Sequence, residues 1–220
     1  MTDISMLRHS LIRAGIAAAI ATVPATGFAE FDPSSALVEA PGVAARYPDP
    51  PTAYATPAFA TGKQDFTSQA ELMTFLRSLA SQAPSMRLDA GARSQQGREL
   101  PVLLFSTAQD AIGTGVKPVV LIIGQQHGNE PAGGEAALVL AQRLGTGDLA
   151  ALLQSIDVII VPRANPDGAA AFVRGLANGV DPNRDHTLLR TPEIRNLGAL
   201  FTRYHPQLVL DCHEFTVGGR

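Results

Sequence analysis

Two histidines and one glutamate stand at the ends of two apolar segments of this chain. His127 and Glu130, three residues apart, follow the apolar run 119–124, and His213 follows the run 208–211. Short apolar runs of this kind predict buried strands. Two imidazoles and one carboxylate form a donor set that can hold a catalytic zinc ion and leave its fourth position open for water. The residue types therefore indicate a metal site, if the fold brings the two segments together.

The His127-x-x-Glu130 spacing is weak evidence when taken alone. Its alternative interpretation is a polar histidine at a strand end, followed by a carboxylate that stabilises the first turn of a helix. The distant His213 favours the metal site. Glu214 is not expected to be a ligand, because it would point to the opposite strand face from His213. His186 is not expected to be a ligand either.

Cys212 is the only cysteine of the chain, so an internal disulfide is excluded. We interpret this residue as a small buried side chain that alternates along a strand, not as a metal ligand.

Strands and helices alternate along the chain from about residue 66. Ser68 and Glu71 form a capping box before a helix whose apolar side chains recur at helical spacing. This alternation predicts an α/β fold with a largely parallel sheet, in which ligands bind beyond the carboxyl ends of the strands. The expected strands are 100–105, 119–124, 156–161 and 207–211; the later helices are 131–144 and 192–204; a long loop spans 162–191.

The composition is that of an ordinary globular domain. The apolar fraction is 45% and the formal net charge is -3, with no basic stripe that would indicate a nucleic-acid partner.

Residues 1–29 resemble a signal peptide: a basic start, an apolar stretch at 14–23, and small residues before the predicted cleavage after Ala29. The alternative is an uncleaved membrane anchor. We expect an exported protein, periplasmic or secreted, with no stable membrane span in the mature chain.

Residues 30–62 are rich in Pro and Ala, which predicts an extended, loosely ordered leader. The folded domain then covers 63–220.

Four short sequence blocks occur in a recognisable order. They are His-Gly-Asn-Glu at 127–130, Asn-Pro-Asp-Gly at 165–168, Asp-x-Asn-Arg at 181–184 and Asp-x-His at 211–213. Together they resemble the zinc carboxypeptidase family, the M14 metallocarboxypeptidases, over roughly residues 66–220. The resemblance implies a three-layer α/β/α sandwich around a mixed, largely parallel sheet.

The resemblance also implies a role for each site residue. The implied ligands of one Zn²⁺ are His127, Glu130 and His213. Arg174 corresponds to the arginine that stabilises the oxyanion, and Asp181 to the carboxylate behind the first zinc histidine. Asn183 and Arg184 correspond to the pair that binds the terminal carboxylate of a substrate. These residue types suit such roles, although Arg174 as a surface residue, Asp181 as a loop cap and Asn183-Arg184 as a solvated turn are the alternatives.

The function implied is a zinc-dependent metallocarboxypeptidase, which hydrolyses C-terminal residues of peptides with a zinc-activated water. One alternative is a zinc-dependent deacylase of N-acyl amino acids, whose substrates also carry a free carboxylate. Another is a non-catalytic zinc-containing binding module. The family's general-base glutamate lies far downstream of the third ligand, whereas this sequence ends at Arg220. We therefore expect an incomplete domain, truncated at its C-terminus.

Overall fold

The computed structural model describes residues 40–48 and 54–214. The predicted signal peptide lies outside these residues, as do residues 30–39 and 49–53 of the predicted leader. Within the leader, Pro41–Arg46 forms the short helix α1, with Pro41 in its first turn. The expected extended conformation is therefore wrong for these residues. No helix in the described ranges combines the length and hydropathy that crossing a membrane requires.

The described residues form one five-stranded sheet in the order β1-β2-β4-β3-β5. β3 pairs in parallel with both β4 and β5, whereas β2 is antiparallel to β4 and to β1. Only β2 therefore runs against the other four strands, and the expected mixed, largely parallel sheet is confirmed. The strands are β1 (Met86–Asp89), β2 (Val102–Phe105), β3 (Val119–Ile123), β4 (Asp157–Val161) and β5 (Leu208–Asp211).

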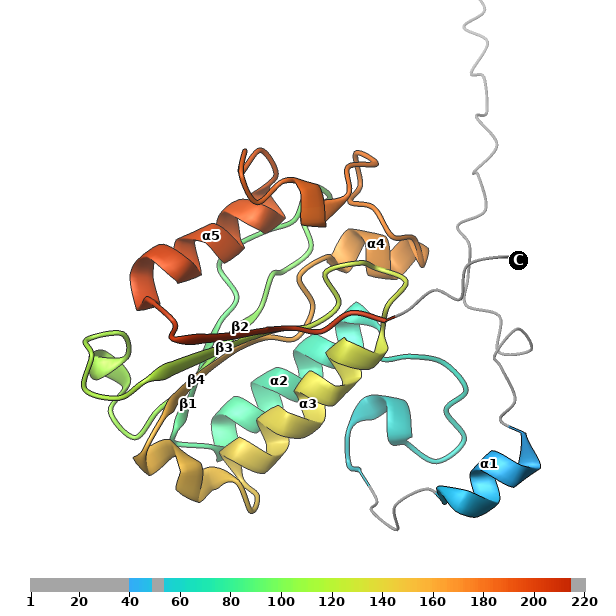
Figure 1. Cartoon of the computed structure of the whole chain (residues 1–220), viewed down its shortest axis with the longest axis horizontal. Coiled ribbons are helices and arrows are strands. Elements are labelled where there is room, and N and C mark those ends of the chain that lie inside the picture. The colour runs from blue at the N-terminus through green and yellow to red at the C-terminus, as the bar shows by residue number, and fades with distance from the viewer. Residues whose placement is uncertain (1–39, 49–53, 215–220) are drawn as a thin grey trace, which may run out of the picture.

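Helices cover both faces of this sheet (Figure 1). α2 and α3 pack side by side on one face, and α5 lies on the other, which gives the three layers. The predicted capping box of α2 is present, because Ser68 and Glu71 each accept a hydrogen bond from the other's backbone N–H. The helices are α2 (Gln69–Gln82), α3 (Ala132–Gly145), α4 (Pro166–Ala171) and α5 (Pro192–Tyr204), with 3-10 helices at Pro57–Phe59, Gln109–Ala111, Ala150–Gln154 and Pro182–Arg184.

Alternate residues of the central strands fill two separate cores. In β4, Val158 and Ile160 pack with α2 and α3, whereas Ile159 and Val161 pack with α5. A strand that is covered on both faces reads as a nearly continuous apolar run, which explains the four consecutive apolar residues at 158–161. β5 differs, because all four of its residues are exposed at the edge of the sheet.

Two predictions about the connections need correction. β1 was not expected, and it pairs with β2 along its whole length. The segment 162–191 is not a plain loop, because it contains α4 and the 3-10 helix Pro182–Arg184. Within the expected loop, Asn165 caps α4 by accepting a hydrogen bond from the Gly168 N–H.

Candidate metal centre

The pairing of β3 with β5 brings together residues that are far apart in the sequence. Ile123 at the end of β3 lies opposite Asp211 at the end of β5, in parallel register. The segments that follow both strands therefore leave the sheet at the same edge. His127 comes from the first segment and His213 from the second.

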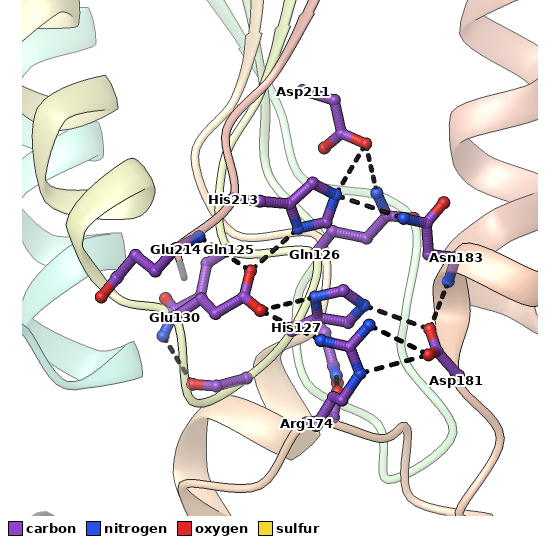
Figure 2. Close-up of polar contacts among 12 residues, drawn as sticks. Gln125, Gln126, His127, Glu130, Arg174, Asp181, Asn183, Asp211, His213 and Glu214 are labelled. Carbon is purple, nitrogen blue, oxygen red and sulfur yellow. Dashed lines mark hydrogen bonds and ion pairs between the residues drawn. The ribbon is translucent and has the colours of Figure 1, made fainter. Parts of the chain in front are cut away.

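Glu130 lies between the two histidines, as Figure 2 shows. Its Oε1 is 2.8 Å from Nδ1 of His127, and its Oε2 is 2.8 Å from Nδ1 of His213. The two imidazole rings are 4.6 Å apart, centroid to centroid. One ligand atom from each of the three residues lies within 4.8 Å of the others, as one metal ion requires.

The loop from β3 to α3 holds two of these residues in a fixed backbone shape. Gln125 has a φ of 47°, which is uncommon for a residue other than glycine. Its side chain donates a hydrogen bond to the Gly128 carbonyl. Gly128 packs directly on the backbone of Gly168, in α4, where a larger residue would not fit. His127 and Glu130 are therefore presented from a loop that is held on two sides.

Arg163 anchors this loop from beneath. It is 4% exposed, and it donates hydrogen bonds to the Gln125 side chain and to the Thr67 carbonyl. Burial lowers the pKa of Arg163 to about 10, while the negative charges of Glu135 and Glu71 act in the opposite direction. The guanidinium therefore stays charged at neutral pH. It connects the loop between β3 and α3 (residues 124–131, the metal loop) to the segment just before α2.

A carboxylate lies behind each histidine. Nε2 of His127 is 3.1 Å from Asp181, and Nε2 of His213 is 3.1 Å from Asp211. In a metal-bound centre Nδ1 of each ring would be the ligand, so each Nε2 would carry the ring proton and donate it to the carboxylate behind it. The Asn183 amide nitrogen is 3.3 Å from Nε2 of His213. It is a donor facing a donor in this tautomer, so we assign the hydrogen bond to Asp211.

The electrostatics of the centre keep Glu130 ionised. Burial opposes ionisation, but hydrogen bonds from His213 and from the Glu214 N–H, together with the charge of His127, hold the pKa of Glu130 below its usual range. For His213, burial favours the neutral ring, but the carboxylates of Glu130 and Asp211 outweigh it and raise the pKa. The pKa of Asp181 is lowered despite burial, through hydrogen bonds from His127, the Asn183 N–H and Arg174.

Arg174 also reaches the centre. Its guanidinium lies 3.2 Å from Glu130 and 3.1 Å from Asp181, and about half of the side chain is exposed. Asn165 donates hydrogen bonds through its side-chain amide to the carbonyls of Arg174 and Gly175. The Asn-Pro-Asp-Gly block therefore fixes the backbone that carries Arg174, in addition to starting α4.

The remaining predicted residues lie at different distances from the centre. Asn183 contacts His213, whereas Arg184 is exposed and donates a hydrogen bond to the Asn183 carbonyl. The carboxylate of Glu214 points away from the two histidines and accepts a hydrogen bond from the N–H of Ala132, in the first turn of α3. Cys212 is partly buried, and burial followed by the charge of Asp211 raises the pKa of its thiol.

Asp211 and Gln126 contact the site but were not among the predicted site residues. The signal for Asp211 is its spacing, because residues i and i+2 of an extended segment face the same side, as Asp211 and His213 do. Gln126 offers no comparable signal, since its partners come from distant segments.

An α/β/α sandwich with two histidines and a glutamate at the carboxyl edge of its sheet defines an α/β protein with a candidate metal site. Residues 72–216 match the zinc carboxypeptidase (M14) family. The chain belongs to this family, as the four sequence blocks predicted.

Relatives with known names and structures agree with this assignment. Carboxypeptidase 2 of Trichophyton rubrum is 37% identical over 170 residues, which is 73% of this chain and 31% of that protein. A metallo-carboxypeptidase from Burkholderia cenocepacia is 26% identical, with a TM-score of 0.59, over 66% of this chain and 40% of that one. Carboxypeptidase A from Helicoverpa armigera shares the fold, with a TM-score of 0.61 at 24% identity, over 69% of this chain and 46% of that one. The chain spans about a third of the length of the curated relatives that it matches.

Proposed function

We propose that this protein is a zinc-dependent metallocarboxypeptidase whose single zinc ion is held by His127, Glu130 and His213. The observation that carries the proposal is the convergence of two imidazole Nδ1 atoms on the two oxygens of one buried carboxylate. The donor set fits zinc, because Asp181 and Asp211 can each accept a proton from Nε2 of one histidine, which leaves both Nδ1 atoms to bind an ion beside Glu130. When bound, zinc lowers the pKa of a water ligand and polarises a carbonyl group.

The protein's own residues would orient the substrate around this centre. Arg174 presents its guanidinium beside Glu130, where it would donate hydrogen bonds to an oxyanion that develops on the scissile carbonyl. Asp181 contacts both His127 and Arg174, so it orients the two groups with respect to each other.

Asn183 and Arg184 would bind the substrate's terminal carboxylate. Arg184 is exposed, and the planar fork of a guanidinium matches a carboxylate in two places, while the Asn183 amide adds one directed hydrogen bond. This carboxylate contact would select the end of a peptide chain over an internal bond.

The deacylase alternative would use the same zinc centre and the same carboxylate contact. The relatives are named carboxypeptidases, which favours peptides as the substrate class.

We also propose that the protein is exported, on the strength of the N-terminal sequence pattern alone. Detection of the native protein in the periplasmic or culture fraction, with Glu30 as its N-terminal residue, would test this.

Zinc content and substrate choice test the function. The native protein is expected to bind one zinc per chain and to hydrolyse a peptide with a free C-terminus much faster than its C-terminal amide or an N-acyl amino acid. Faster hydrolysis of the N-acyl amino acid would favour the deacylase. Tight zinc and peptide binding without turnover would favour the non-catalytic module.

Arg184→Ala tests the carboxylate contact directly. It is expected to raise KM for the free-acid peptide about tenfold or more, since about 1.4 kcal/mol of lost binding corresponds to tenfold. Arg87→Ala, which removes an exposed arginine from the opposite edge of the sheet, is the matched control. An unchanged KM in Arg184→Ala would exclude the proposed carboxylate contact.

A further inference from the structure

Gln126 lies next to the first predicted zinc ligand, yet its side chain contacts the segment of the second. It is completely buried, and its amide nitrogen donates a hydrogen bond of 2.7 Å to Oδ2 of Asp211. The same Oδ2 atom is 3.1 Å from Nε2 of His213. Figure 2 shows Gln126 and His213 meeting at this one carboxylate oxygen. Gln126 thus connects the loop after β3 to the histidine after β5.

A third residue fixes the orientation of the Gln126 amide. The carbonyl oxygen of Gln126 is 2.6 Å from Nε2 of His186, an exposed residue that follows the Asp-x-Asn-Arg block. Asp211 can only accept hydrogen bonds, so the amide NH₂ must face it and the amide oxygen must face His186. His186 then donates from Nε2. One arrangement of protons satisfies all three hydrogen bonds, whereas the opposite amide orientation would place the Gln126 oxygen against the Asp211 carboxylate, two acceptors facing each other, and lose that hydrogen bond.

Asp211 needs this support because of its position. It ends β5, and its side chain is about one-third exposed. Without a second partner it could turn toward solvent and release the His213 ring. Asp181, behind the other histidine, has additional partners in the Asn183 N–H and Arg174. Gln126 fills the corresponding place for Asp211.

We propose that Gln126 is a positioning residue of the metal centre, which acts through Asp211 to hold the His213 ring with Nδ1 facing the ion, and that His186 orients the Gln126 amide. The inference rests on the proposed zinc function. Groups that orient a metal-binding histidine typically change metal affinity by about 10- to 100-fold when they are removed.

Three variants separate the parts of this arrangement. Gln126→Leu removes both hydrogen bonds at similar volume. Gln126→Glu keeps the acceptor for His186 but loses the donor to Asp211. His186→Ala keeps the Gln126–Asp211 hydrogen bond and removes only the group that orients the amide. Gln207→Leu is the control, because Gln207 also joins β5 to β3, through the Val119 N–H, but at the opposite end of these strands.

The measurements are zinc affinity by competition with a chromogenic chelator and the visible absorption spectrum of the Co²⁺-substituted protein. Thermal melting of the metal-free variants identifies any loss of folded protein. Both Gln126 variants are expected to lose zinc affinity by roughly 10- to 100-fold and to show an altered Co²⁺ spectrum, with a smaller loss for His186→Ala. Gln207→Leu is expected to keep the wild-type affinity and spectrum, whatever its melting temperature.

Wild-type affinity and spectrum in the folded Gln126 variants would overturn the inference and leave the zinc site intact. The same result in His186→Ala would overturn the role of His186, even if a Gln126 variant failed to fold. A wild-type protein that binds no zinc would instead overturn the proposed function, and this inference with it.

Discussion

Gly128 packs so closely on Gly168 that a Cβ atom on Gly128 would lie 2.0 Å from the Gly168 carbonyl carbon. The contact joins two of the four sequence blocks, His-Gly-Asn-Glu and Asn-Pro-Asp-Gly, backbone to backbone. The glycine in the first block is thus explained by space and not by a φ that only glycine adopts. The position of the loop that carries His127 and Glu130 depends on this contact.

Gly128→Ala is therefore expected to displace the metal loop. Since the clash is with backbone atoms, no side-chain rotation can relieve it, and overpacking of this kind costs about 1–3 kcal/mol or more. Thermal unfolding and zinc affinity should both decline. Gly42→Ala is the control, because nothing lies within 4 Å of its added Cβ. An unchanged melting temperature and zinc affinity in Gly128→Ala would contradict the packing argument.

Asp181→Asn tests the carboxylate behind His127. The amide can present NH₂ to Nε2 of His127 and so favour the wrong tautomer, which would leave Nδ1 protonated. We expect zinc affinity to fall by about 10- to 100-fold, as measured by chelator competition. Asp148→Asn removes a carboxylate that pairs with Arg143 at an exposed position and should leave zinc affinity unchanged. Equal affinities for the two variants would show that Asp181 does not orient His127.

Arg163→Met tests the anchor beneath the metal loop. The methionine fills the space but leaves the Thr67 carbonyl and the Gln125 side chain without their charged donor. The expected loss of unfolding free energy in denaturant titration is about 2–3 kcal/mol, because hydrogen bonds to charged groups contribute roughly 1.5–3 kcal/mol. Arg77→Met, which breaks an exposed pair with Glu99, should cost only about 0–1 kcal/mol. A loss in Arg163→Met no larger than this would contradict the anchor role.

Glu71 makes stability depend on pH at the start of α2. Hydrogen bonds from Lys63 and then from the Ser68 backbone lower its pKa from 4.5 to about 2. Because the folded-state pKa is the lower one, this contribution is complete above pH 4.5 and is lost as the pH falls toward 2. The melting-temperature difference between wild type and Glu71→Gln should therefore be largest above pH 5 and shrink toward pH 2.

Lys63→Met is the companion variant for this pH series. Since it removes the strongest cause of the shift, it should reduce the same pH-dependent difference while leaving the capping box in place. A difference between wild type and Glu71→Gln that stays constant from pH 6 to pH 2 would show that the Lys63–Glu71 pair does not contribute.

Much of the fold could be predicted, because local patterns decide it. The Ser68–Glu71 capping box and the apolar spacing after it identify α2, and the apolar run at 158–161 identifies the strand β4. β1 was missed because Met86 is the only buried residue among its four. α4 was missed because an asparagine that caps a short helix and one that starts a turn use the same side-chain hydrogen bond.

The sequence by itself determined the donor types and placed each at the end of a strand. Local periodicity specifies where strands lie, but it does not specify which strands are neighbours. Only the tertiary structure decided that β5 pairs with β3, and this pairing places His213 against Glu130, 83 residues away in the chain. The link from Gln126 to Asp211 spans 85 residues and depends on the same pairing. A side-chain hydrogen bond requires both backbones to be in place, so only the folded chain could define it.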